Sequence, residues 1–155
     1  LGFSAGGHLC STAVTMFDDE FEQETNDPVD QLSCRPDFGV LCYPVIAMGQ
    51  PYCHQGSVRN LLGASPSKGL MARNNTAMRV TNRTPPIFHV HSADDRAVPL
   101  RNGTDFAVAC AAKGVPVTCH FYAQGGHGYG LGRTGDSKSW PSRLEEWLRH
   151  NEWME

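Results

Sequence analysis

The pattern of apolar and polar residues along the chain predicts three strands. Apolar residues form short, nearly continuous runs at 38–43 and 87–90, each next to prolines. Such runs are typical of strands in a parallel sheet that is covered on both faces. The run at 115–121 alternates instead, which predicts a strand with two different faces. One of these faces carries Val115, Val117, Cys119 and Phe121.

Helices are predicted between and after these strands. A helix over 5–17 is rich in small residues that allow close packing on a sheet, and a helix over 101–113 is stopped by Gly114. Ser139-Trp140-Pro141 begins a last helix, whose apolar residues Trp140, Leu144, Trp147 and Leu148 fall on one face. This order of elements predicts an α/β fold with parallel strands. Because no repeat or linker interrupts it, we expect one domain.

Two connections between the predicted elements are long. Residues 18–36 form an acidic, polar loop, and residues 44–84 show only short helical hints at 58–62 and 70–73. A long irregular connection inside a compact domain is usually functional. We therefore expect residues 44–84 to lie above the C-terminal edge of the sheet and to wall a substrate pocket.

The first residues of the chain carry its most specific motif. Gly2-Phe3-Ser4-Ala5-Gly6 matches G-x-S-x-G, the signature of a nucleophile elbow, in which a sharp strand-to-helix turn exposes a strained serine. Glycines two residues before and after the serine leave room for the strand and the helix to pass close to each other. Ser4 is the predicted nucleophile, and a plain turn serine is the alternative.

The two partners that a serine nucleophile needs follow in order. Asp95 comes after the strand at 87–90 and three residues before Val98-Pro99, and His127 lies in a glycine-rich loop after the strand at 115–121. Ser, Asp, His is the chain order of the α/β-hydrolase triad, whose acid and base each follow a strand. We predict that His127 is the general base and acid and that Asp95 orients it. The neighbouring Asp94 is the second candidate, and otherwise it caps the loop or faces solvent.

The other histidines and the cysteines are expected to have structural roles. His8, close to Ser4, and His91, at the end of the strand before Asp95, are expected to make structural hydrogen bonds. No carboxylate–histidine cluster indicates a catalytic metal, and we expect no metal and no cofactor. Six cysteines without C-x-x-C spacing indicate neither a zinc site nor a redox motif. Cys42, Cys110 and Cys119 are expected to be buried thiols, and Cys34 and Cys53 are the candidates for a disulfide if the protein is exported.

The composition limits the possible partners. A formal net charge of −3 gives no electrostatic case for binding nucleic acid. No apolar run approaches the ~20 residues that a membrane span needs. We therefore expect neither nucleic acid nor a membrane as a partner.

With these motifs, the chain resembles α/β-hydrolase esterases of the acetyl xylan esterase-like group along nearly its whole length. The resemblance includes the elbow at 2–9, the segments 35–46 and 113–117, and the loops of Asp95 and His127. Asn60-Leu61-Leu62-Gly63 is its most group-specific piece. The resemblance implies a Ser4–Asp95–His127 triad and hydrolysis of short acyl esters. The implied substrate is a small ester or an acetylated saccharide such as acetylated xylan.

The resemblance also implies that residues 1–155 are part of a larger catalytic domain. The strands that precede the elbow in this fold, and the loop that supplies the second oxyanion donor, do not occur in this sequence. Ala5 supplies the first donor through its backbone N–H. Because losing one donor typically slows turnover about 100- to 1000-fold, we expect this chain alone to be poorly folded and nearly inactive. If the substrate is a polymer, we expect a secreted or periplasmic protein.

Two other interpretations stay open. A prolyl oligopeptidase-type serine peptidase has similar acid and histidine loops, and a fold does not fix a substrate. A large additional domain upstream in the parent gene would indicate this peptidase. A non-catalytic scaffold that kept the three residues by descent is the other alternative, and failure of a fluorophosphonate to label Ser4 would indicate it.

Overall fold

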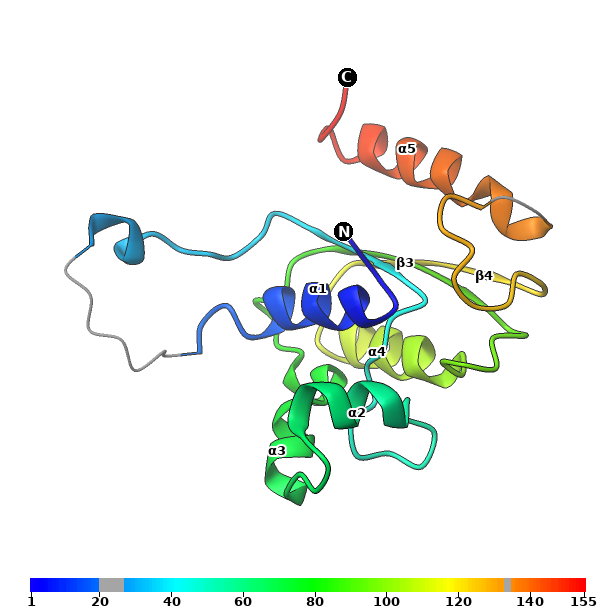
Figure 1. The fold of residues 1–155 in the computed structure, drawn as a ribbon. Helices are drawn as coiled ribbons and strands as arrows, with labels where there is room; N and C mark the ends of the chain where they lie inside the picture. Colours follow the sequence, from blue (N-terminus) through cyan, green and yellow to red (C-terminus); the bar gives the residue numbers. More distant parts are fainter. Residues whose placement is uncertain (20–26, 133–134) are drawn as a thin grey trace.

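A parallel sheet forms the centre of the molecule, seen in a computed structural model that describes residues 1–19, 27–132 and 135–155 (Figure 1). Within these residues the strands are β1 (Gly2–Phe3), β2 (Gly39–Cys42), β3 (Ile87–Ser92) and β4 (Val117–Tyr122), side by side in this order. All three neighbouring pairs are parallel. Every residue of β2 and β3 is buried, as their continuous apolar runs predicted. The predicted α/β fold with parallel strands is confirmed.

The helices occur where the sequence predicted them, with small shifts at their ends. They are α1 (Ala5–Thr15), α2 (Gln55–Leu62), α3 (Lys68–Arg73), α4 (Arg101–Ala112) and α5 (Trp140–His150), with 3₁₀ turns at Pro28–Gln31, Thr76–Arg79 and Asp136–Ser139. Helix α2 begins before the predicted 58–62 because His54 Nδ1 accepts the Ser57 N–H and so caps it. Strand β4 begins at Val117 rather than at Val115, since Pro116 has no N–H for a strand ladder. Part of the predicted acidic loop at 18–36 lies outside the described residues.

Helices cover both faces of the sheet. Figure 1 shows α5 on one side of the strands and α1 and α4 on the other. Successive side chains of β3 pack against the helices on opposite faces of the sheet. Ile87 packs with Phe106 of α4, whereas Phe88 packs in a cluster with Trp140 of α5. This double covering explains why the central strands are apolar on both faces.

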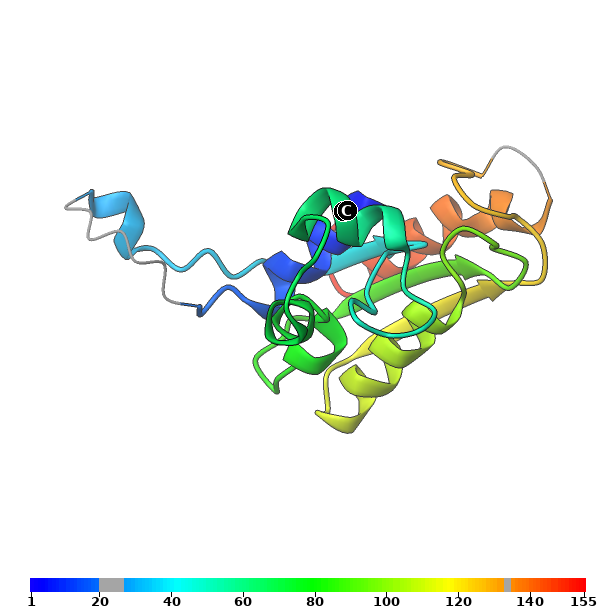
Figure 2. The ribbon, with the colours of Figure 1, turned by 60° about the horizontal axis from the view of Figure 1, so that its bottom comes forward.

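The long segment between β2 and β3 contains α2, α3 and the turn at Thr76–Arg79 (Figure 2). Val45, Met48 and Val58 of this segment form an apolar cluster with Val98. Because Val98 follows the C-terminal end of β3, this cluster places α2 near the carboxyl edge of the sheet. The predicted position is therefore supported for residues 45–58, whereas the last residues of the segment lead into the N-terminal end of β3.

The packing of α1 depends on a glycine at position 7. A Cβ on Gly7 would lie 2.7 Å from Cβ and 2.8 Å from Cα of Pro44. We expect Gly7→Ala to lower the free energy of unfolding by about 2–3 kcal/mol, because backbone must move to admit the methyl group. Gly69→Ala in the exposed α3 is the matched control, since the nearest atom to its Cβ would be 3.9 Å away. Urea unfolding of the whole natural polypeptide that contains this chain measures both variants, and equal stabilities of the two would contradict this explanation.

Strand β3 also buries a histidine without a polar partner. His89 is 1% exposed, and within the described residues neither of its ring nitrogens has a hydrogen-bond partner. Burial, reinforced by the nearby ring of His91, holds the pKa of His89 well below its usual 6.5. The folded protein therefore keeps this imidazole neutral.

This buried imidazole predicts a loss of stability in mild acid. As pH falls below about 6.5, His89 takes up a proton in the unfolded chain but not in the folded one, so acid favours unfolding. We expect His89→Leu to raise stability by about 1–2 kcal/mol, because it removes an unsatisfied buried polar group, and to weaken the acid dependence. Urea unfolding of both proteins at about pH 7.5 and about pH 5.5 measures this. An equal loss in the two proteins would assign the acid dependence to other groups.

The cysteines of the described residues are free thiols. Cys42 and Cys110 are buried, and burial raises the pKa of each to about 12. Cys119 is half-buried rather than fully buried, because β4 is one of the two edge strands of the sheet that the described residues form. Cys34 is exposed and Cys53 is partly exposed, and they do not form the candidate disulfide. In the part of the chain that the structure describes, no helix is long and apolar enough to cross a membrane.

Candidate active site

Ser4 lies on the sharp turn between β1 and α1. Its backbone has a φ of +53°, in the left-handed region that is strained for a residue with a side chain. The Ser4 N–H donates to the Cys42 carbonyl at 3.0 Å, and the Val45 N–H donates to the Ser4 carbonyl at 3.1 Å. The end of β2 therefore holds the strained turn from both sides of the serine.

The second glycine of the motif has a different role from the one predicted. A Cβ on Gly2 would lie 2.0 Å from the Gly6 carbonyl oxygen, so strand and helix do approach closely at Gly2. A Cβ on Gly6, by contrast, would meet no described atom within 4 Å beyond its chain neighbours and its own helix backbone, and the crowded helical position is Gly7. Successive residues of a helix point in directions about 100° apart, so Gly7 faces Pro44 while Gly6 faces away.

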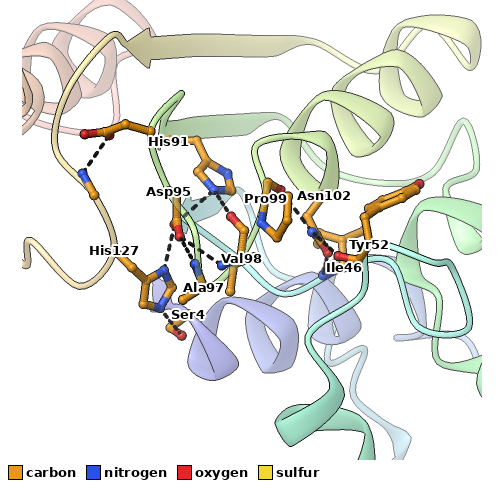
Figure 3. Close-up of polar contacts among 12 residues, drawn as sticks. Ser4, Ile46, Tyr52, His91, Asp95, Ala97, Val98, Pro99, Asn102 and His127 are labelled. Atoms are coloured by element: carbon orange, nitrogen blue, oxygen red, sulfur yellow. Dashed lines mark hydrogen bonds and ion pairs between the residues drawn. The ribbon is translucent and has the colours of Figure 1, made fainter.

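Ser4, His127 and Asp95 form a chain of hydrogen bonds (Figure 3). His127 Nε2 lies 2.8 Å from Ser4 Oγ, and His127 Nδ1 lies 2.7 Å from Asp95 Oδ2. An ionised carboxylate only accepts hydrogen bonds, so the imidazole proton lies on Nδ1 and Nε2 is free to accept the serine proton. The structure thus brings together three residues that are far apart in the sequence.

The Asp95 carboxylate is fully buried and is surrounded by donors. Its Oδ1 accepts the N–H groups of Ala97 at 3.0 Å and Val98 at 2.9 Å, and its side chain is 0% exposed. Burial alone raises the pKa of Asp95, but hydrogen bonds from His91, Val98 and His127 outweigh burial and lower the pKa below its usual 3.8. Asp95 is therefore a fixed negative charge beneath the imidazole.

The glycine-rich loop that carries His127 is fastened at both ends. Gly126 and Gly130 have positive φ angles that let the chain turn tightly. Asp94 Oδ1 accepts the Gly126 N–H at 2.8 Å, which gives Asp94 the loop-capping role that was its alternative to acting as the acid. At the other end, the Gly130 N–H donates to the Tyr43 hydroxyl at 3.0 Å, and Trp140 Nε1 donates to the Gly130 carbonyl at 2.9 Å.

Tyr43 is a residue of the site that sequence reasoning missed. It follows β2, has a φ of +37° and places its ring 4.9 Å from the His127 ring in an edge-on arrangement. A positive φ is rare for an aromatic residue and marks a constrained position. No local pattern could reveal this, because the contacts of Tyr43 with the His127 ring and the Gly130 N–H are with a loop more than eighty residues away.

Asn102 was also missed as a support of the site. It is fully buried in α4, and its Oδ1 accepts the N–H groups of Ile46 at 3.1 Å and Ala47 at 3.0 Å (Figure 3). Asn102 thereby holds the start of the 44–84 segment against the loop that carries Asp95. The predicted structural hydrogen bonds of the two neighbouring histidines are confirmed: His8 Nε2 lies 2.9 Å from the Asn74 carbonyl, and His91 Nε2 lies 2.9 Å from the Val98 carbonyl.

A cleft of about 420 Å³ lies beside the elbow, between α1 and α2. Ala5 and Leu9 of α1 line one side, and Met48, Asn60 and Leu61 of the 44–84 segment line the other. Ala5 is the first residue of α1, so its N–H has no acceptor inside the helix and remains available to a ligand oxygen. The 44–84 segment thus walls a cleft beside Ala5, and that this cleft receives the substrate stays a prediction. Among the described residues, no group of three or more His, Cys, Asp or Glu could hold a metal ion.

Comparison with known proteins identifies the family. Residues 55–152, well over half of the chain, match the prolyl oligopeptidase family. The chain belongs to the prolyl oligopeptidase family. The matched region contains Asp95 and His127 and begins after Ser4.

Relatives of this prolyl oligopeptidase family member include xylan-related hydrolases. The crystal structure of an acetyl ester-xyloside bifunctional hydrolase from Caldicellulosiruptor lactoaceticus is 41% identical, with a TM-score of 0.92 over 99% of this chain and 56% of that one. An acetylxylan esterase from Xylanibacter ruminicola is 35% identical over 85% of this chain and 26% of its own length. The endo-1,4-beta-xylanase B of Butyrivibrio fibrisolvens is 38% identical over 83% of this chain and 20% of its own length.

These comparisons confirm two predictions made from the sequence. The chain is similar to acetyl xylan esterases, and its sheet and helices form part of an α/β-hydrolase fold. A carboxylesterase from Lactobacillus plantarum, 24% identical with a TM-score of 0.75, shares this fold. The chain spans about half of the solved hydrolase and about a quarter or less of the curated relatives.

Proposed function

We propose that this chain carries the catalytic residues of a serine esterase that cleaves short-chain carboxylic esters, with acetyl esters on sugars or xylan as its substrates. Ser4 is the nucleophile, His127 the general base and acid, and Asp95 the group that orients the imidazole. The observation that carries the proposal is the hydrogen-bonded chain from Ser4 Oγ through His127 to the buried Asp95. The names of the acetylxylan esterase and the acetyl ester-xyloside hydrolase support the choice of ester.

The reaction follows from this geometry in two halves. Ser4 Oγ attacks the ester carbonyl while its proton moves to His127 Nε2, and the Asp95 carboxylate stabilises the imidazolium. The Ala5 N–H donates to the oxyanion. His127 then gives the proton to the leaving alcohol, which departs and leaves an acyl group on Ser4. Water repeats the sequence, releases the acid and restores Ser4.

We also propose that residues 1–155 form one part of a larger catalytic domain. This proposal rests on the partial coverage of the relatives, since the chain aligns with 56% of the solved hydrolase. The remaining part would supply a second oxyanion donor and complete the pocket for the acyl group. The intact protein, meaning the whole natural polypeptide that contains this chain, is therefore the material for every activity measurement below.

A serine peptidase is the second candidate, because the family is described as the prolyl oligopeptidase family. The same nucleophile, base and acid would serve either reaction, so the residues described above do not separate them. The names of the acetylxylan esterase and the acetyl ester-xyloside hydrolase favour the ester.

The test is a parallel measurement of acetate release from acetylated xylo-oligosaccharides and of cleavage of proline-containing peptides. We expect the intact protein to release acetate and its Ser4→Ala variant to release none. Peptide cleavage without acetate release would establish the peptidase instead. Activity of either kind that persists unchanged in the Ser4→Ala variant would overturn the proposed nucleophile.

A further inference from the structure

A second histidine contacts the carboxylate that holds His127. His91 lies in β3 with its side chain 0% exposed, and its Nε2 is 3.3 Å from Asp95 Oδ2 and 2.9 Å from the Val98 carbonyl oxygen (Figure 3). Asp95 Oδ2 therefore lies between two imidazoles, those of His91 and His127. The two rings differ in their freedom, because the His127 side chain is 24% exposed and that of His91 is completely buried.

The surroundings of His91 define which nitrogen carries its proton. Both groups near Nε2 are acceptors, so Nε2 must be the donor. Within the described residues the buried Nδ1 has no hydrogen-bond partner, and Gly103 of α4 packs so closely that a Cβ there would lie 3.0 Å from this atom. A proton on Nδ1 would be buried without an acceptor, which is costly. His91 therefore acts as a neutral N–H donor to Asp95 and Val98.

We propose that His91 is a positioning residue for the reaction, which fixes the Asp95 carboxylate and limits the negative charge that Asp95 presents to His127. This inference rests on the proposed function. The His91 N–H is shared between the Val98 carbonyl oxygen at 2.9 Å and Asp95 Oδ2 at 3.3 Å. Its contact with Oδ2 adds to the hold of His127 on that oxygen, while the Ala97 and Val98 N–H groups hold Oδ1. The His91 N–H also partly compensates the negative charge of Oδ2. Without this N–H, more of that charge would act on the imidazolium of His127.

The titratable groups around this arrangement are few. His89 lies beside His91 on β3 with ring centroids 5.8 Å apart, and Tyr43 lies against His127. Asp94 is engaged with the Gly126 N–H. Helix α4 presents Gly103, which has no side chain to titrate. A change at His91 is therefore expected to act on the reaction through Asp95.

The test compares three proteins: the intact wild type, His91→Leu and His91→Gln. Leucine has a similar volume to histidine but cannot donate a hydrogen bond, whereas the glutamine amide can donate from nearly the position of Nε2. We expect His91→Leu to lower kcat about 10- to 100-fold with KM nearly unchanged, because the acid is misplaced in the transition state. We expect His91→Gln to remain within about fivefold of the wild type.

The pH profile separates positioning from a merely structural role. Without the donor, more of the Asp95 charge acts on His127 and stabilises its imidazolium form. We expect the acidic limb of kcat/KM in His91→Leu to move upward by about half a pH unit, and that of His91→Gln to stay in place. Thermal unfolding checks that each variant is folded. If His91→Leu does not fold, His91→Asn takes its place, since the shorter amide cannot reach Oδ2.

Each outcome decides the inference. A folded His91→Leu variant with wild-type kcat and an unshifted acidic limb overturns it. A His91→Gln variant whose kcat is as low as that of His91→Leu overturns it too. Wild-type protein that hydrolyses no ester or peptide would overturn the proposed function and this inference with it. Ser4-dependent hydrolysis by the wild type, with no response at His91, would overturn this inference alone.

Discussion

Changing Ser4 to alanine in the intact protein is expected to reduce kcat for ester hydrolysis by about 10⁴- to 10⁶-fold. The change removes the atom that forms the acyl intermediate, so neither half of the reaction can follow the proposed route. The residual rate would come from the oxyanion donors and from substrate binding. Initial rates of acetate release at saturating substrate measure this effect.

Ser65→Ala is the matched control for this change. Ser65 is an exposed serine between α2 and α3, and we expect its variant to keep the wild-type rate. Thermal unfolding should give similar stabilities for all three proteins, since alanine is smaller than serine. A Ser4→Ala protein that keeps more than about a tenth of the wild-type rate would refute the nucleophile.

The second large effect is expected at Asp95. Asp95→Asn should lower kcat by about 10⁴-fold, because an amide can donate to His127 Nδ1 and so stabilise the tautomer that cannot accept the serine proton. The amide also lacks the charge that stabilises the imidazolium. Rates are measured across the pH range in which the wild type is folded. Loss of less than about tenfold would show that another group orients the imidazole.

Asp94→Asn tests whether the effect belongs to Asp95 specifically. The asparagine oxygen can still accept the Gly126 N–H, so we expect less than about a tenfold loss of kcat. The two neighbouring substitutions remove the same charge from the same loop. A larger loss at Asp94 than at Asp95 would exchange the roles of these residues.

Asp95 also links stability to pH. Its pKa is lowered in the folded protein, so the ionised carboxylate stabilises the fold above about pH 4, and this contribution is lost as pH falls below that value. The buried His89 acts at higher pH, below about 6.5. The two contributions are therefore separable in one series of unfolding experiments.

The sequence predicted those parts of the site that depend on local backbone geometry. The three-residue spacing from Asp95 to Val98 is a tight turn in which the Val98 N–H returns to the carboxylate. The strained φ of Ser4 follows from the abrupt change from strand to helix at that residue. The strands that precede Asp95 and His127 were recognisable from their own apolar patterns, which depend on burial rather than on distant partners. The two-residue strand before Ser4 has no such pattern and was indicated only by the G-x-S-x-G motif.

The features that escaped sequence reasoning depend on contacts between distant segments. Tyr43 accepts the Gly130 N–H and Trp140 donates to the Gly130 carbonyl, and the sequence around Tyr43 and Trp140 indicates neither contact. The crowded position of α1 proved to be Gly7 because of Pro44, which no pattern near Ser4 identifies. The partial burial of Cys119 follows from the position of β4 at an edge of the sheet. That position depends on how the strands pair and not on the sequence of β4 itself.

Covalent labelling by a fluorophosphonate shows directly whether Ser4 is the activated nucleophile. The intact protein is treated with the reagent, digested and mapped by mass spectrometry, beside the Ser4→Ala and His127→Ala variants. The account predicts one phosphonyl group on Ser4, none in Ser4→Ala and much slower labelling of His127→Ala, because only an activated serine reacts. A label on a different residue, or no label on folded protein that hydrolyses esters, would contradict it.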